Sequence, residues 1–315
     1  MNSLPAGIQS RKVITELEPE VLREALKSLR IDEILVIETD LNREDCTVLL
    51  RTFGKHWRCR FKRDSDTIWT RSCKVDLPIP IHYWPLSHYV NMIDSNKPFV
   101  FSRYNDGEWN YMVDTILRGR KQKITPMLRE DVRQTLIHRH EDPQYLMAMS
   151  PVYYLARIGL LGHVVAFLEE HNLTDTEWVE INVFNAALAA GELGPFIQAL
   201  RRTNTIIVGP RYYSALTESV LPDATYFPIP STQCYSQVDE IEAGILALVR
   251  RPAVITLSAG PAAQILIHRL YPHIGKHSTM IDMGSTWGPF VGRVEHAVHR
   301  NITKEMMERN RSVSK

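Results

Sequence analysis

The sequence has few cysteines, no long apolar run and no excess of charge of either sign. Its four cysteines form no Cys-x-x-Cys pair, which argues against a zinc or redox motif and predicts reduced thiols. No apolar run approaches the roughly 20 residues that a membrane-spanning helix needs, and no signal-like apolar segment opens the chain. The 37 basic and 36 acidic residues give no broad basic field for nucleic acid. We therefore expect a cytoplasmic globular protein with no transmembrane segment and no nucleic-acid partner.

The first 80 residues have the pattern of a small separate module. An amphipathic helix is predicted over 18–30, because its apolar residues share one face. Strand-like segments rich in β-branched and aromatic residues follow, at 33–38, 47–53, 57–62 and 67–74. These segments predict a small α+β module over residues 1–80, with an antiparallel meander. Prolines at 78, 80 and 85 then mark a linker.

Residues 86–297 alternate between strands and helices. Strands are predicted at 205–208, 225–227, 253–257 and 278–281, each separated from the next by a helical segment, and 253–257 is a candidate for a buried strand. This alternation is typical of a Rossmann-like parallel sheet flanked by helices, in which ligands bind beyond the carboxyl ends of the strands. The turns after these strands should therefore share one edge. Residues 298–315 form a polar tail, and we expect its end to fray.

The turn Ser258-Ala-Gly-Pro261 follows one of these strands and precedes a helix. Gly260 allows close backbone approach to a ligand, and Pro261 suits the first helical position. The free N–H groups of that helix would suit a phosphate, and the alternative is an ordinary strand-to-helix turn in which the glycine allows tight packing. The segment is not a Walker loop. Because no Gly-x-Ser-x-Gly elbow is present, Ser258 is a poor candidate for a nucleophile.

The segment Arg103-Tyr-Asn-Asp-Gly-Glu108 occupies another predicted strand-to-helix turn. Asp106 and Glu108, separated by Gly107, could converge on Mn²⁺ or Mg²⁺, which prefer oxygen ligands and often share a substrate diphosphate. Arg103 adds a permanent fork of donors for phosphate. Helix capping is the alternative, since Asn105-x-x-Glu108 matches a capping box. Capping leaves Arg103 unexplained.

The Arg103–Glu108 motif resembles the signature of the GT-D-type glycosyltransferases, with Asn105 where glycine is usual. Later segments resemble that family's order of elements, and the likeness extends over roughly 89–293. These segments are Gly191-Glu-Leu-Gly-Pro-Phe-Ile197, Ile206-Ile-Val-Gly209, Leu257-Ser-Ala-Gly-Pro-Ala-Ala263 and Ile281-Asp-Met-Gly-Ser285.

The resemblance implies a metal-dependent enzyme that moves a sugar from a nucleotide-diphosphate sugar to a hydroxyl of a glycan or glycoconjugate. It implies that Asp106 and Glu108 hold the cation and that these two, with Arg103, are the catalytic residues. The nucleotide-sugar site that it implies comprises Arg103, Asn105, Gly107, Gly209, Ser258, Gly260, Pro261, Asp282, Gly284 and Ser285.

Several roles stay open at this point. Asp282 is either the base that activates the acceptor or a buried capping residue. Tyr212 and Tyr213 either pack half-buried or stack on a sugar or base. Two other functions also fit two carboxylates beside a basic residue: a metal-dependent nucleotide phosphohydrolase, and a non-catalytic module that binds nucleotide or acts as a scaffold.

Overall fold

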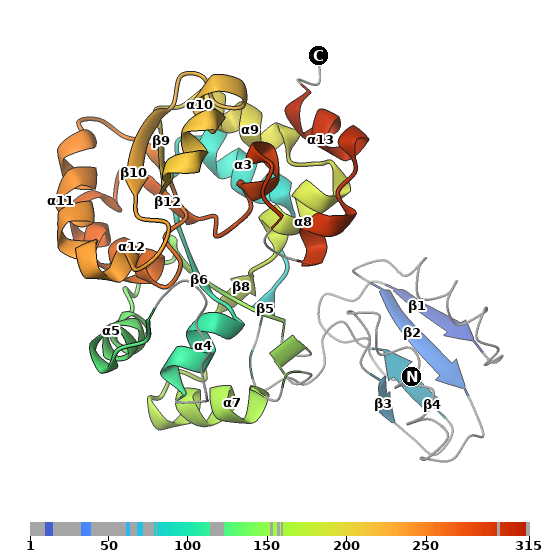
Figure 1. Ribbon diagram of the computed structural model, residues 1–315. Coiled ribbons are helices and arrows are strands. Elements are labelled where there is room, and N and C mark those ends of the chain that lie inside the picture. Colours follow the sequence, from blue (N-terminus) through green and yellow to red (C-terminus); the bar gives the residue numbers. More distant parts are fainter. Residues whose placement is uncertain are drawn as a thin grey trace. The chain divides into compact units, whose positions relative to one another are not determined.

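The computed structural model describes four strands in the first 80 residues and most of the chain beyond. The described residues are 10–14, 33–38, 61–63, 68–71, 79, 81–113, 123–151, 154, 155, 158, 160–294 and 297–312. The chain divides into two compact units, one of residues 1–78 with 152–158 and one of residues 79–151 with 159–315. Figure 1 shows the elements of both units.

The first unit contains a four-stranded sheet in the order β1-β2-β4-β3. Its strands are β1 (Ser10–Ile14), β2 (Glu33–Glu38), β3 (Phe61–Arg63) and β4 (Ile68–Arg71). Strand β2 has the predicted bounds, and β3 and β4 overlap predicted strands. The antiparallel meander is wrong in one respect, because β1 was not predicted and pairs parallel with β2. The predicted helix at 18–30 and the strand at 47–53 lie outside the described residues.

The second unit is built on an eight-stranded sheet in the order β10-β9-β11-β12-β6-β7-β8-β5. Every neighbouring pair runs parallel. The strands are β5 (Ile81–His82), β6 (Val100–Tyr104), β7 (Tyr145–Met149), β8 (Trp178–Glu180), β9 (Thr205–Pro210), β10 (Thr225–Ile229), β11 (Val254–Leu257) and β12 (Thr279–Asp282). The prediction of a Rossmann-like parallel sheet is confirmed, and the predicted turns share its carboxyl edge.

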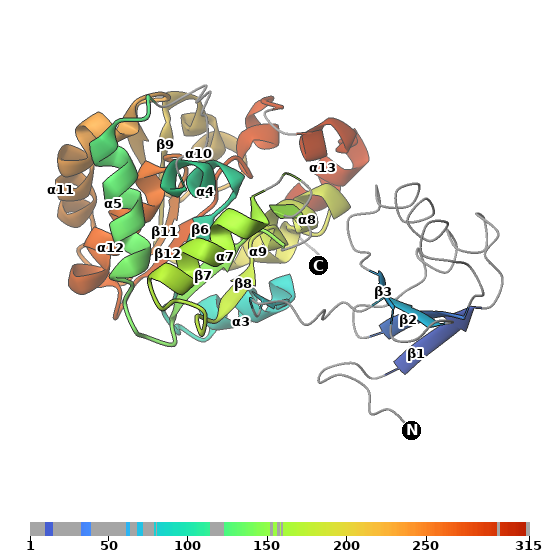
Figure 2. The same cartoon turned by 90° about the horizontal axis from the view of Figure 1, so that it is seen from below.

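Helices cover both faces of this sheet (Figures 1 and 2). One face carries α4 (Asp106–Met112), α5 (Pro126–Ile137), α7 (Leu161–Glu170), α11 (Val238–Leu248) and α12 (Ala262–Ile274). The other carries α3 (Leu86–Asp94), α8 (Val183–Ala190) and α9 (Gly194–Arg201). Shorter elements are η1 (Arg211–Ala215), α10 (Leu216–Ser219), η2 (Cys234–Gln237), η3 (Gly288–Val291), η4 (Ala297–Asn301) and α13 (Lys304–Arg311).

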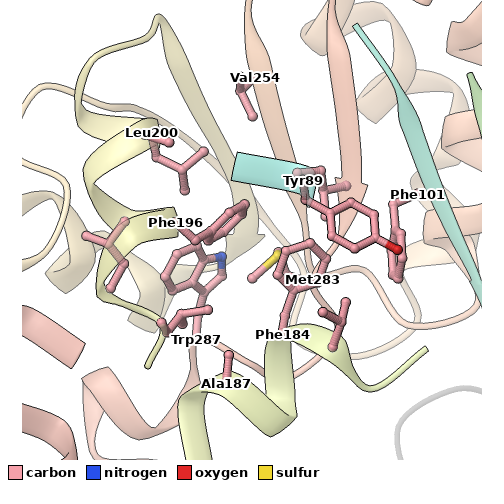
Figure 3. Packing of buried hydrophobic residues seen from close by; sticks show 14 of the residues in the cluster. Tyr89, Phe101, Phe184, Ala187, Phe196, Leu200, Val254, Met283 and Trp287 are labelled. Atoms are coloured by element: carbon pink, nitrogen blue, oxygen red, sulfur yellow. The ribbon is translucent and has the colours of Figure 1, made fainter. Parts of the chain in front are cut away.

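The main core lies between the sheet and the layer of α3, α8 and α9 (Figure 3). Tyr89 of α3 packs edge-on against Phe101 of β6, and Phe184 of α8 contacts both rings. Trp287, which follows β12, stacks near Phe196 of α9 and is fully buried. The segment after β12 is therefore held on this face of the sheet.

Strands β6 and β12 are neighbours, but the chain leaves them toward opposite faces. After β6 it enters α4, which packs on α5, whereas after β12 it enters the core that contains Trp287. Such a reversal between adjacent strands is a topological switch point, where open parallel sheets bind their ligands. The pairing of β6 with β12 covers only Val100 with Met280 and Phe101 with Ile281, so their carboxyl ends separate.

The end of the chain differs from the frayed tail that its polarity predicts. Thr303 caps helix α13, and the helix packs on α8 and α9. Its Asn310 is fully buried, accepts a hydrogen bond from the Leu193 N–H and donates one to the Leu188 carbonyl. The expectation of fraying is wrong for residues 304–311, because one buried asparagine satisfies backbone groups in the α8–α9 connection.

No single helix in the described part of the chain is long and apolar enough to cross a membrane. Helices α8 and α9 have the length and apolar composition of a membrane span only when they are counted together, and their axes are bent by 113°.

Candidate functional site

Individual capping hydrogen bonds fix the turn from β6 into α4. Asn105 is the N-cap of α4, and its backbone N–H donates to the Glu108 carboxylate at 3.0 Å in a capping box. Ser150, at the end of neighbouring β7, donates to the Asn105 side-chain oxygen at 2.5 Å. The capping interpretation is therefore confirmed. Glu108 uses one carboxylate oxygen, Oε2, in this contact.

Aromatic packing holds α4 in place behind this turn. Trp109, the residue after Glu108, is fully buried among the rings of Tyr104, Phe167 and Trp178. The Tyr104 hydroxyl forms a 3.0 Å hydrogen bond with Thr135 of α5. Because the buried tryptophan anchors α4, the first turn of the helix has one orientation. The backbone positions of Asp106 and Glu108 are therefore fixed.

Arg103, at the end of β6, is buried against the turn that follows β12. A Cβ atom placed on Gly284 would lie 2.0 Å from Nη1 of Arg103, so the guanidinium occupies the space that a side chain would fill. Gly284 also has a φ of +52°, in the left-handed region that favours glycine. Arg103 and Gly284, which are distant in the sequence, thus form one packed contact at the switch point.

Gln264, in the first turn of α12, joins the separated ends of β6 and β12. Its Nε2 donates to the Arg103 carbonyl and, at 3.1 Å, to Oδ2 of Asp282. The other oxygen of Asp282 accepts the Gly284 N–H at 2.8 Å. Asp282 is buried, as the helix-capping alternative expected, but it caps no helix: it holds the turn that follows β12 through its bond to Gly284.

Two carboxyl groups at the switch point have raised pKa values. Burial, and after it the nearby charge of Asp282, raise the pKa of Glu108 to about 7 against the lowering effect of Arg103. Burial also raises the pKa of Asp282 to about 6, against the lowering effect of Arg103. Arg103 therefore lies close enough to influence both acids, and the three side chains form one electrostatic group.

Several buried polar atoms at this edge have no hydrogen-bond partner among the described residues, and two of them belong to predicted site residues. They are Nε of Arg103, whose side chain is 9% exposed, and Oγ of Ser258, which is 8% exposed. A buried polar group without a partner is costly, and such groups are commonly satisfied by a bound molecule or water. Both atoms lie at the carboxyl ends of strands that are near neighbours in the sheet, β6 and β11.

The fit of these residues to a divalent cation depends on a second source of oxygens. Among the residues that the structure describes, no group of three or more His, Cys, Asp or Glu side chains could hold a metal ion. Asp106 and Glu108 alone therefore form no closed cage. Two carboxylates fit Mg²⁺ or Mn²⁺ only when a diphosphate and water complete the coordination, which is the usual arrangement for Mg²⁺.

The turn between β11 and α12 has the backbone features that a ligand contact requires. Gly260 is exposed and has a φ of +59°, and a Cβ atom placed on it would have no neighbour within 4 Å. Pro261 precedes the first residue of α12 rather than occupying it, and Ser258, which directly follows β11, is buried. A ligand could therefore approach the N-terminus of α12 past the exposed Gly260 turn.

Other predicted residues have packing roles in this fold. A Cβ on Gly209 would lie 2.5 Å from the Tyr213 ring, so this glycine allows Tyr213 to pack. Tyr213 is 1% exposed, which rules out stacking on a ligand, whereas Tyr212 is half-buried. Ser285 is buried in the turn that contains Gly284, and Gly107 has open space around its Cα.

The structure brings Arg103, Glu108, Asp282 and Gly284 together, with Asp106 on the same turn as Glu108. The sequence analysis missed Gln264, which bonds to two of these segments. The available signal was a lone glutamine within the apolar run Ala262-Ala-Gln-Ile-Leu-Ile267, because a glutamine buried there needs polar partners.

Comparison with solved structures shows which known fold the chain shares. No protein-family model and no curated protein matches the chain. A new glycosyltransferase from Streptococcus sanguinis, which carries domain of unknown function 1792, superposes with a TM-score of 0.52 and 15% identity, over 67% of this chain and 83% of that one. A structure of the same kind of domain, described as having a distinct glycosyltransferase fold, has a TM-score of 0.52 and 17% identity, covering 73% and 94%. At these identities the likeness shows that the chain shares this fold.

Proposed function

We propose that the chain is a glycosyltransferase that moves a sugar from a nucleotide-diphosphate sugar to a hydroxyl of a glycan or glycoconjugate. The shared fold supports the proposal. The observation that carries it is the buried guanidinium of Arg103, placed with Glu108 and Asp282 at the switch point, with its Nε lacking a partner among the described residues. A permanent cation fixed at this edge suits a diphosphate.

Arg103 would bind the diphosphate and stabilise the negative charge that grows on it as the nucleoside diphosphate leaves. Its packing against Gly284 holds the guanidinium in place before substrate arrives, which is the condition for strong electrostatic catalysis. The Gly260 turn would face the nucleotide, offering N–H groups at the start of α12. Asp282, already bonded to Gly284 and Gln264, would keep this geometry and would not activate the acceptor.

Asp106 and Glu108 would hold Mn²⁺ or Mg²⁺ together with oxygens of the diphosphate. When bound, the cation would neutralise charge on the leaving group. Glu108 would contribute the oxygen that the capping bond to Asn105 does not use. Asp106, half-buried at the first position of α4, would contribute from the same turn.

The test is a transfer assay with a panel of nucleotide sugars and glycan acceptors, with Mn²⁺ or with chelator. Asp106→Asn and Glu108→Gln should each keep their fold and lose activity by orders of magnitude. Glu170→Gln, which changes an exposed acid at the end of α7, is the matched control and should retain full activity. Full activity of Asp106→Asn and Glu108→Gln would overturn the site assignment.

Product analysis distinguishes the other functions. Release of inorganic phosphate without nucleoside diphosphate would indicate a phosphohydrolase instead. A ligand that binds only the native state must raise thermal stability. If no nucleotide raised it, with or without Mn²⁺, the chain would be a module that does not bind nucleotides.

A further inference from the structure

A second basic side chain is held rigidly at the same sheet edge, beyond β9. The guanidinium carbon of Arg293 lies 4.0 Å from the centre of the Tyr212 ring, which is a close cation–π contact. The Arg293 N–H donates to the Gly288 carbonyl at 2.9 Å, and Gly292 before it has a φ of +73°. This bond pattern closes the end of η3 and fixes the backbone that carries Arg293.

The ring beneath Arg293 is itself supported. Tyr212 packs edge-on against Tyr213, with ring centres 4.8 Å apart and an interplanar angle of 85°. Tyr213 is buried against Gly209. Tyr212 therefore rests on the core, and Arg293, an exposed residue, lies on Tyr212. Arg293 is therefore the outer layer of a stack that begins in the core.

The position of this platform relative to Arg103 follows from the order of the strands. The edge runs β9-β11-β12-β6, so Tyr212, which follows β9, is three strands from Arg103 at the end of β6. Three spacings of about 4.8 Å give a separation of roughly 14 Å along the sheet. The open Gly260 turn, after β11, lies between them. A diphosphate at Arg103 that extends past Gly260 therefore directs its nucleoside toward Tyr212.

We propose that Arg293, supported by Tyr212, is the platform on which the nucleobase of the donor stacks. This inference rests on the proposed function. A guanidinium is planar, delocalised and weakly hydrated, so it stacks on aromatic faces, and nucleobases stack on arginine planes. Every base has such a face, so the platform recognises the nucleoside of a nucleoside diphosphate without selecting the base.

Calorimetric titration with Mn²⁺ present tests the platform with two probes: a nucleoside diphosphate, and inorganic pyrophosphate, which has the phosphates without a base. Arg293→Ala should weaken binding of the nucleoside diphosphate roughly tenfold or more and leave pyrophosphate binding unchanged. Arg293→Lys keeps the charge but loses the plane, and it should behave like Arg293→Ala.

Arg211→Ala is the matched control, because Arg211 is also exposed at this edge and directly precedes Tyr212. It removes the same charge, and any effect should be equal for the two probes. If Arg293→Lys binds like the wild type, or if Arg293→Ala weakens both probes equally, Arg293 acts through its charge on phosphate and the stacking proposal is overturned. Unchanged affinity in Arg293→Ala also overturns it. If the wild-type protein binds no nucleoside diphosphate, the proposed function itself has failed.

Discussion

Two strand-to-helix turns at one sheet edge, β6 to α4 and β11 to α12, differ in what they present. The first presents charged side chains, with Arg103 and Glu108 held in place by packing and capping. The second presents backbone and open space, with Gly260 exposed in a left-handed conformation. The difference indicates a division of roles in which one turn supplies charge and the other allows close approach.

The largest expected effect comes from removing the charge at the first turn. Arg103→Met should lower kcat/KM of the proposed transfer reaction by about 10²–10³, because a preorganised donor to the developing charge is lost. Steady-state kinetics measure this, with circular dichroism to check the fold. Arg103→Lys should recover only part of the loss, since an ammonium cannot bind a phosphate with a fork of donors. Full activity of Arg103→Met would show that the first turn does not supply the charge that the reaction needs.

Alanine at two glycines compares the turns directly. Gly284→Ala should destabilise the protein by about 2–4 kcal/mol, because its Cβ overlaps Arg103 and its φ is left-handed. Gly260→Ala should cost only about 1–2 kcal/mol, since its conformation is unfavourable but its surroundings are open. Urea denaturation gives both values. Equal costs would mean that Arg103 does not depend on the space at Gly284.

Gln264 should matter more than Gln198, a half-buried glutamine of the same unit. Gln264→Leu removes the donor to Asp282 and to the Arg103 carbonyl, and should lower the free energy of unfolding by about 1–3 kcal/mol. Gln198→Leu is the matched control, because Nε2 of Gln198 has no partner among the described residues. If Gln198→Leu lowers the free energy of unfolding as much as Gln264→Leu, the stabilising role of the Gln264 hydrogen bonds is contradicted.

A further expected effect is a dependence of stability on pH in the metal-free protein. Folding raises the pKa of Glu108 from 4.5 to about 7 and that of Asp282 from 3.8 to about 6, so the native state binds more protons in this range. Their contribution to stability is present below about pH 4 and is lost as pH rises through 6 and 7. The free energy of unfolding should therefore fall between about pH 5 and pH 8. Glu108→Gln should flatten this fall, and an unchanged slope in that variant would contradict the assignment.

Local pattern was enough to predict the C-terminal strands of the second unit but not β5, β7 and β8. Apolar runs bounded by glycine and proline predicted β9, β10, β11 and β12 to within a few residues, and their alternation with helices predicted the parallel sheet. The capping box at Asn105 was also readable, because it depends on residues three apart. By contrast, β1 pairs parallel with β2, a non-local choice that no local periodicity encodes.

Polarity alone misjudged the tail, because α13 docks through Asn310, which satisfies two buried backbone groups elsewhere in the chain. Tyr213, whose role was open between packing and stacking, packs against Gly209. In each case the deciding partner is distant in sequence or lies in the core, so the residue itself carries little sign of its role.

The amino-acid order by itself determined which segments become strands and which turn carries Arg103, Asp106 and Glu108, because those properties depend on neighbouring residues. Only the tertiary structure decided that Arg103 lies on Gly284, that Gln264 joins β6 to β12 and that Arg293 rests on Tyr212. These contacts join residues separated by many turns of chain. They form only when the sheet sets the strands in their order and brings the carboxyl ends to one edge.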